Sequence, residues 1–232
     1  MEVTLAQMIA AWLLPVLLAI TLHEVAHGWM ALRLGDRTAQ MLGRLTLNPI
    51  KHIDPIGTIL VPGLLLLSPV PFVFGWAKPV PVDYRNLHNP KRDMAIVAAA
   101  GPLANLAMGV MWALLAHLVL AFGGGWGGAA MPLLFMAVAG IFINTILLVI
   151  NLLPLPPLDG GRVLTGLLPG PWAWRFSRIE PYGIIILLVL LVTGMLGWLL
   201  WPAVGAVMSA LAGLSGMTGG DFMRILRMLM GG

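Results

Sequence analysis

The sequence contains no cysteine, so the chain can form no disulfide bond and offers no thiolate ligand to a metal ion. Charge is scarce as well: charged residues make up 9% of the 232 residues, whereas a soluble domain carries about 25%. The hydrophobic fraction is 59% and the mean hydropathy is +0.95. These values exclude an ordinary soluble protein and predict an integral membrane protein.

The net charge of +4 is modest, and the basic residues are explained by membrane orientation rather than by nucleic acid. Most of them share one side of the membrane if the apolar segment 56–76 does not cross it, whereas the loop 123–130 has none. Because basic loops stay inside, we expect a multi-pass protein of the inner cell membrane with its N-terminus outside. The basic residues on the expected cytoplasmic side are Arg33, Arg37, Arg44, Lys51, Lys78, Arg85, Lys91, Arg92, Arg162, Arg175 and Arg178.

Apolar runs of about 20 residues are long enough to cross a hydrocarbon core of about 30 Å. The sequence predicts spans at residues 5–34, 94–122, 131–153 and 182–201. Residues 56–76 are apolar but interrupted by proline and glycine, which favours a re-entrant, β-hairpin-like segment over a straight span, because non-helical backbone at membrane depth must be buried in protein. The sequence does not decide whether this segment crosses fully.

The predicted fold class is therefore an all-α polytopic membrane protein with a bundle of about four to six transmembrane helices. A re-entrant or β-hairpin-like segment lies between the first two core helices. We expect one domain over residues 1–232, with a core at 5–168 and a C-terminal span and amphipathic tail at 182–232. The oligomeric state is not encoded in any pattern that we can identify.

The stretch HEVAH, residues 23–27, lies within the first predicted span. His23 and His27 are spaced i and i+4, so they project from one helical face and can hold one Zn²⁺, while Glu24 is offset and can address a bound water. Ionisable residues within a span are costly and functional by default. The alternative is a pair of histidines hydrogen-bonded across a bundle, with Glu24 protonated.

A catalytic zinc needs a third protein ligand and one open position. Asp159 is a candidate because it directly follows a span, in NLLPLPPLDGGR, where three prolines forbid a continuous helix and two glycines permit close backbone approach. A broken helix at depth is tolerated chiefly where it lines a cavity. The alternative is that this stretch is only a turn between two hydrophobic elements.

Two further polar patterns lie within the spans. In AGPLAN, Gly101 and Pro102 favour close helix approach, and Asn105 is expected to cap a polar contact near the site. Asn144 lies on the face of Asn151 and is expected to join two helices. The alternation in Arg44 to Leu47 indicates a strand edge that could pair with an extended substrate, although an ordinary surface loop fits as well.

Taken together, HEVAHGW and NLLPLPPLDGGR resemble the site-2 protease family of intramembrane zinc metalloproteases, and GRLTLNP, HIDPIGT, FGWAKPVPV and AGPLANL strengthen the resemblance. The type it resembles is the compact bacterial and archaeal one without a PDZ domain. The resemblance implies that His23, His27 and Asp159 bind one zinc ion per chain and that Glu24 is the general base. It also implies that Asn151 assists at the substrate or transition-state oxygen.

The predicted function is hydrolysis of a peptide bond within or near a transmembrane segment by zinc-activated water, with access from the cytoplasmic side. The expected partners are a transmembrane protein substrate and the lipid bilayer, and no nucleic acid. The alternative function is a zinc-binding membrane protein without protease activity, either a metal carrier or a scaffold. The sequence identifies neither the substrate nor the means of regulation.

Overall fold

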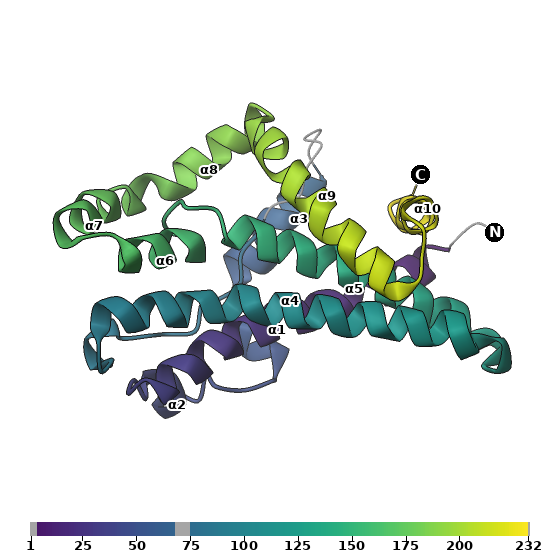
Figure 1. Ribbon diagram of the computed structural model, residues 1–232, viewed down its shortest axis with the longest axis horizontal. Helices are drawn as coiled ribbons and strands as arrows, with labels where there is room; N and C mark the ends of the chain where they lie inside the picture. Colours follow the sequence, from purple (N-terminus) through teal and green to yellow (C-terminus); the bar gives the residue numbers. More distant parts are fainter. Residues whose placement is uncertain (1–3, 68–74, 232) are drawn as a thin grey trace.

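The computed structural model describes residues 4–67 and 75–231, and these form helices and loops without any strand (Figure 1). The prediction of an all-α protein is confirmed. The α-helices are α1 (Leu5–Arg33), α2 (Thr38–Met41), α3 (Val61–Leu66), α4 (Pro90–Phe122), α5 (Ala130–Asn151), α6 (Asp159–Leu167), α7 (Gly170–Ser177), α8 (Gly183–Val192), α9 (Met195–Ser215) and α10 (Gly219–Leu229).

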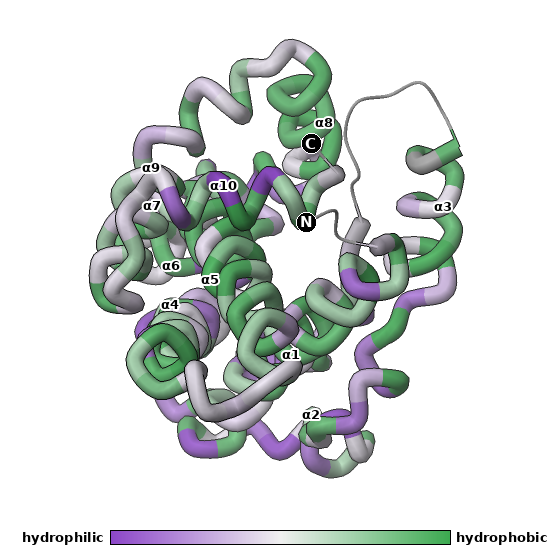
Figure 2. The backbone as a smooth tube through the Cα atoms, turned by 90° about the vertical axis from the view of Figure 1, so that its right-hand side faces the viewer, coloured by the Kyte–Doolittle hydropathy of each residue, from purple (hydrophilic) through white to green (hydrophobic). Residues whose placement is uncertain are grey.

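Within the described residues, four helical segments are long and apolar enough to cross a membrane, and they contain α1, α4, α5 and α9. The chain is a multi-pass membrane protein, at the lower end of the predicted number of spans. Figure 2 shows hydrophobic residues along α1, α4, α5 and α8, and hydrophilic residues gathered in the loops around α2.

Helix α4 is the centre of the bundle and packs against α1, α5 and α6 (Figure 1). Small side chains make this close packing possible, because they let helix backbones approach one another in lipid. Ala113 and Ala116 on α4 and Ala137 and Ala139 on α5 are fully buried. Helices α1, α5 and α6, which are far apart in the sequence, therefore all pack closely against α4.

Helix α1 begins at a capping box formed by Thr4 and Gln7 and ends before Gly35, whose φ of 113° only glycine adopts readily. The next residue, Asp36, is fully buried although it is charged. Its carboxylate accepts hydrogen bonds from the Thr38 and Asp83 amides at 3.0 and 2.9 Å and from the Asn86 side chain at 3.0 Å. Asp36 therefore fastens the segment before α4 to the end of α1.

The predicted re-entrant segment begins with a π-helical turn, Pro55–Leu60, followed by α3. Its two ends meet, because the Trp76 amide donates to the Gly57 carbonyl at 3.0 Å and the Thr58 hydroxyl donates to the Trp76 carbonyl at 2.8 Å. This contact fits a chain that returns to its starting point. Residues 68–74 at the turn lie outside the described residues, so the re-entrant path stays a prediction.

Of the two interpretations of Arg44 to Leu47, the strand edge is wrong and the ordinary loop is confirmed, since Leu45 to Leu47 form a bend and no strand is present there. Instead of offering a strand edge, Arg44 donates from Nη2 to the carbonyl oxygens of Lys78 and Pro79, at 3.0 and 3.3 Å. Alternation over four residues was too short a pattern to distinguish a strand from a loop that binds another loop.

The predicted span 182–201 is also wrong, because the helix breaks between α8 and α9. The Thr193 hydroxyl bonds back to the Val189 carbonyl at 2.7 Å, and Gly194 takes a left-handed conformation with φ of 75°. The apolar composition continues through the break and conceals it. The long helix here is α9, which extends beyond the predicted end of the span at residue 201 to Ser215.

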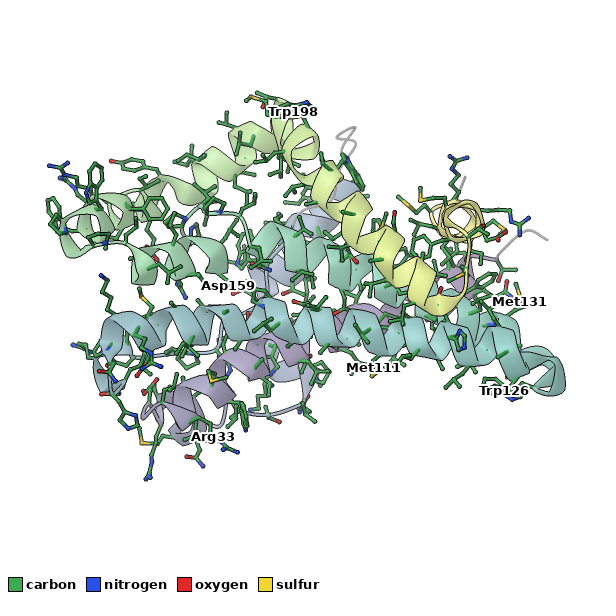
Figure 3. All side chains as sticks on the ribbon, viewed as in Figure 1. Arg33, Met111, Trp126, Met131, Asp159 and Trp198 are labelled. Atoms are coloured by element: carbon green, nitrogen blue, oxygen red, sulfur yellow. The ribbon has the colours of Figure 1, made fainter. Side chains whose placement is uncertain are left out.

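The amphipathic tail forms α10, capped by Thr218. Its apolar side chains Phe222, Leu226 and Leu229 are buried against the bundle, and the Trp12 indole on α1 donates to the Leu229 carbonyl at 3.1 Å. In Figure 1, α10 and the N-terminus lie at one end of the molecule, and α2 and α7 lie at the other. Arg33 and Trp126, labelled in Figure 3, mark these opposite ends.

Candidate metal centre

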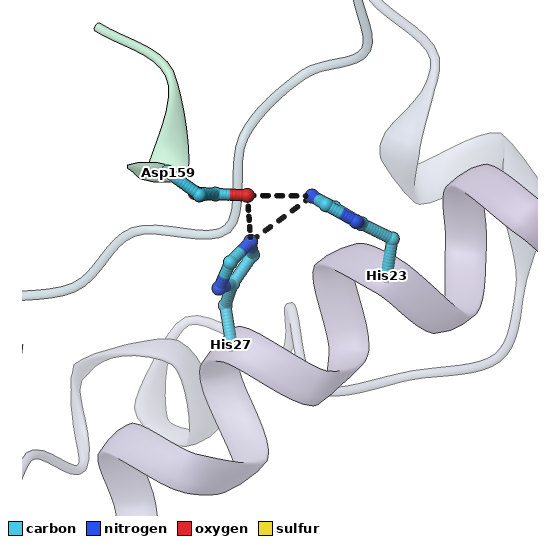
Figure 4. Close-up of side chains that lie close together, drawn as sticks. All are labelled: His23, His27 and Asp159. Carbon is cyan, nitrogen blue, oxygen red and sulfur yellow. Dashed lines mark hydrogen bonds and ion pairs between the residues drawn. The ribbon is translucent and has the colours of Figure 1, made fainter. Parts of the chain in front are cut away.

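Three predicted ligands from distant parts of the chain meet at one point. His23 and His27 project from one face of α1, one helical turn apart, and Asp159 is the first residue of α6 (Figure 4). The two Nε2 atoms are 3.1 Å apart, and Asp159 Oδ2 lies 3.2 Å from His23 Nε2 and 3.3 Å from His27 Nε2. The structure therefore brings together the three residues that could hold a metal ion.

Each imidazole has an oxygen acceptor on its other nitrogen. His27 Nδ1 lies 2.8 Å from the Val97 carbonyl oxygen, and His23 Nδ1 lies 2.6 Å from Asn105 Oδ1. An oxygen acceptor requires a proton on Nδ1, so in the neutral imidazoles both Nε2 atoms carry a lone pair. The two lone pairs point at each other and at the carboxylate.

This donor set fits a zinc ion. Asp159 Oδ2 is buried and has no hydrogen-bond donor among the described residues. A tetrahedral ion with bonds of about 2.0–2.1 Å to its ligands keeps those ligand atoms about 3.3 Å apart, close to the three separations given above. A cation would resolve the contact of three electron-rich atoms, and two histidines with one carboxylate form a catalytic zinc set that leaves a fourth position open.

Helix α4 has the shape that this site requires. A Cβ atom at Gly101 would collide with His27 Nε2 and would lie 2.6 Å from His23 Cε1, so only glycine leaves room for both rings. Pro102 cannot donate a backbone hydrogen bond and weakens the bonds of the turn before it. The Val97 carbonyl, which receives the His27 proton, belongs to that turn.

The turn before α6 brings Asp159 to the histidines. Helix α5 ends at Asn151, and the chain folds back through the cis peptide bond between Pro156 and Pro157. A Cβ atom at Gly161 would lie 2.8 Å from the Pro156 Cα atom, so the first turn of α6 can pack on this loop only with glycine there. The alternative interpretation of LDGG as only a turn is wrong, because Leu158 is the N-cap of α6 and Asp159 to Gly161 form its first helical turn.

Glu24 follows His23 on α1, outside the group of three, and its side chain is partly buried. Its Oε2 atom accepts a hydrogen bond of 2.7 Å from the backbone amide of Val80. Val80 lies in the sequence Lys-Pro-Val-Pro, and prolines carry no amide proton, so the Val80 amide is isolated between Pro79 and Pro81. The extended loop before α4 therefore delivers one donor to Glu24.

Asn151, the remaining predicted site residue, is the last residue of α5. Its side-chain amide donates to the Leu147 carbonyl of the same helix at 3.0 Å. Among the described residues its side chain makes no hydrogen bond to the three ligands, and it lies at the start of the loop that carries Asp159.

The sequence indicated some of the supporting groups and missed others. AGPLAN predicted a polar contact at Asn105, but its partner His23 was not identified. The backbone groups of Val80 and Val97 were missed, because every residue carries an amide and a carbonyl. The only signal for Val80 was its position between two prolines.

Comparison with known proteins gives three matches of note. The chain is similar to the protein named "Putative zinc metalloprotease YwhC" of Bacillus subtilis, with 39% identity over 180 residues that cover 74% of the chain and 75% of YwhC. It is similar to the protein named "Putative zinc metalloprotease Rip2" of Mycolicibacterium smegmatis, with 36% identity over 154 residues, or 66% of the chain and 53% of that protein.

The protein of the same name from Mycobacterium tuberculosis is 31% identical over 172 residues, or 67% of the chain and 55% of that protein. The chain thus spans about half the length of the two Rip2 proteins and three quarters of YwhC. No family model matches the chain, and no solved structure gives a significant match.

Proposed function

The chain belongs to the site-2 protease family of zinc metalloproteases, and from this premise we propose that it is an intramembrane endopeptidase that cuts a transmembrane protein substrate. The observation that carries the proposal is the group of His23, His27 and Asp159 inside a bundle of membrane-spanning helices. His23 lies ten residues before Arg33 at the charged end of α1, a distance of about 15 Å along the helix.

In this proposal His23, His27 and Asp159 hold one zinc ion per chain. Zinc, when bound, lowers the pKa of a water molecule from about 15.7 to about 7 and polarises a carbonyl group. The protein contributes the fixed orientation of the two imidazole ligands, through the contacts of Val97 and Asn105 with the Nδ1 atoms.

Glu24 would act as the general base. It takes a proton from the attacking water at its carboxylate and delivers it to the leaving amide nitrogen. The Val80 amide holds Oε2, so the orientation of the carboxylate is set by the backbone of the loop before α4. Asn151 would assist at the substrate oxygen, for which its side chain must leave the Leu147 carbonyl.

The substrate would be a helix that unwinds locally, because a transmembrane helix hides its carbonyl groups in its own hydrogen bonds. We propose access from the cytoplasm and a place in the inner membrane, supported by the basic residues of the loops next to α1, α4 and α7. Single cysteines test this orientation in a chain without other cysteines. A membrane-impermeant maleimide added outside should label Gly125→Cys and spare Arg37→Cys, and the reverse pattern would refute the orientation.

The whole chain, 1–232, is proposed as one such domain, with α8 to α10 added to the core.

The rival function is a zinc carrier or scaffold. A carrier needs polar groups at several depths along a path, whereas the three donors here lie at one point. Glu24 lies outside the donor group, and its presence is explained by proton transfer rather than by metal binding alone.

The deciding experiment uses purified protein, a panel of single-span peptides in detergent, and the Glu24→Gln variant. Glutamine keeps an oxygen for the Val80 amide but cannot take a proton, so cleavage should fall by about 10²–10⁴-fold while zinc stays near one ion per chain. Glu180→Gln, at an exposed carboxylate outside the site, is the matched control and should cleave normally.

Cleavage that persists in Glu24→Gln would refute the proposed role of Glu24. If the wild-type protein cuts no peptide but moves zinc into liposomes, the carrier function is correct instead.

A further inference from the structure

Two asparagines are buried in the helical bundle behind the metal centre. Asn105 on α4 and Asn144 on α5 are both fully buried. A buried amide is costly unless its donors and acceptors are paired. Here they form a chain of hydrogen bonds that starts at the backbone of α5, crosses to α4 and ends at His23 on α1.

The direction of this chain is fixed at its far end. The Gly140 carbonyl can only accept, so Asn144 places its NH₂ group there, at 2.9 Å. The Asn144 oxygen then faces Asn105 and must receive a donor, which is Asn105 Nδ2 at 3.0 Å. A second acceptor, the Ala19 carbonyl at 3.2 Å from the same Nδ2 atom, requires the same orientation.

The oxygen of Asn105 consequently faces His23 Nδ1, at 2.6 Å. Since this oxygen can only accept, the proton of a neutral His23 is placed on Nδ1 and the lone pair on Nε2. That lone pair points at His27 Nε2 and Asp159 Oδ2. Two carbonyls, on α1 and on α5, thus determine which nitrogen of His23 is free.

We propose that Asn105 and Asn144 are positioning residues that hold His23 in the tautomer and ring orientation needed to bind zinc. The inference rests on the proposed function, because it assigns these residues to the same site. Groups that receive the second N–H of a histidine ligand fix its orientation and raise its basicity. An amide does this without placing a further charge in the bundle, where an unpaired carboxylate would be costly.

A purely structural role for the two asparagines would join α1, α4 and α5 without affecting zinc. The variants Asn105→Leu and Asn144→Leu separate the two roles, with Thr145→Val as a matched control. Thr145 is 1% exposed on α5, next to Asn144, and its hydroxyl has no hydrogen-bond partner among the described residues. It therefore has the burial of Asn144 without the connection to His23.

The first readout is the zinc dissociation constant, measured by competition with a chelator. Asn105→Leu should raise it about 10–100-fold. Asn144→Leu should raise it less, because Asn105 keeps the Ala19 carbonyl as an orienting partner. Thr145→Val should leave it unchanged.

The second readout is the tautomer of His23 in zinc-free protein, observed by ¹⁵N NMR of labelled histidine. The wild-type protein should show the proton on Nδ1, and Asn105→Leu should show a mixture or the Nε2 form. A role that only joins helices would not move this signal. If Asn105→Leu fails to fold, the same two readouts on Asn144→Leu decide.

If Asn105→Leu shows an unchanged His23 tautomer, or a zinc dissociation constant within about twofold of the wild-type value, the proposal is overturned. The tautomer measurement needs neither zinc nor substrate. If the wild-type protein neither binds zinc nor cleaves, the proposed function fails while the hydrogen-bonded chain can still be judged by NMR.

Discussion

At the scale of single residues, Gly101 is a position where the two histidine ligands leave no room for a side chain. It faces both histidine rings, and the atoms that a Cβ would meet belong to the two ligands themselves. A ring displaced by a few tenths of an ångström loses the mutual distances that suit one ion. The site therefore depends on the absence of a side chain at Gly101 of α4.

Gly101→Ala should lose zinc affinity without losing the fold. We expect the new methyl group to push His23 and His27 apart and to weaken zinc binding by at least about tenfold, the loss that follows from disturbing the groups around metal ligands. Isothermal titration in detergent measures it.

Gly213→Ala in α9 is the control, because its Cβ meets nothing within 4 Å. Alanine is the better helix former, so this variant should be as stable as the wild-type protein or slightly more so. Equal zinc affinity in Gly101→Ala and the wild-type protein would show that the rings have more freedom than the structure indicates.

The residues that the sequence predicted for the site are those with a local pattern. His23 and His27 follow from their spacing on a helix, and Asp159 follows from the prolines before it. The partner of Asn105 could not be predicted, because it depends on how α1 and α4 pack. The donor to Glu24 is a backbone amide of a loop, and no residue type announces it.

At the scale of elements, the loop between α3 and α4 contains Val80, whose amide donates to Glu24. Asp36 anchors the same loop by accepting a hydrogen bond from the Asp83 amide. Burial by itself raises the pKa of the Asp36 carboxyl, but the hydrogen bonds from Asn86, Thr38 and the Asp83 amide outweigh it and keep the pKa below its ordinary value of 3.8. The ionised form is thus the one that the fold stabilises.

Asp36→Asn should loosen this loop. The asparagine NH₂ group cannot accept the Asp83 amide, and a hydrogen bond to a charged acceptor contributes about 1.5–3 kcal/mol. Hydrogen exchange at the Thr38 and Asp83 amides should be faster in the variant at pH 7.

The difference in hydrogen exchange between Asp36→Asn and the wild-type protein should depend on pH. Because the pKa of Asp36 is lowered in the fold, its stabilisation is complete above about pH 4 and is lost as the pH falls below the unfolded value of 3.8. The wild-type and variant proteins should therefore converge at low pH. A gap that widens on acidification would contradict this account of Asp36, and Asp83→Asn, at a carboxylate paired with exposed Arg85, should exchange like the wild-type protein.

Elements were predictable where apolar length alone decides them. The predicted spans that correspond to α1, α4 and α5 lie within about one helical turn of the observed bounds. A long apolar segment in lipid must pair its own backbone groups, and it does so by forming a helix. The break between α8 and α9 was missed, because Thr193 and Gly194 are a weak signal inside an apolar run. The sequence left a strand and a loop open at Arg44, because the partners of Arg44 on another loop are not visible in the sequence.

At the scale of the whole molecule, the account rests on a meeting of the two halves of the chain. Helix α1 supplies two imidazoles and α6 supplies one carboxylate, with α4 between them in sequence and against both in space. Figure 4 shows these three side chains converging. In the proposed function, the bundle is the scaffold that would keep this meeting point inside the membrane.

The most direct test is a structure of zinc-loaded protein with an anomalous difference map collected at the zinc absorption edge. We predict one peak per chain, within about 2.0–2.2 Å of His23 Nε2, His27 Nε2 and an Asp159 carboxylate oxygen. A zinc-replete protein without a peak there, or with Asp159 turned away from the two imidazoles, would contradict the account.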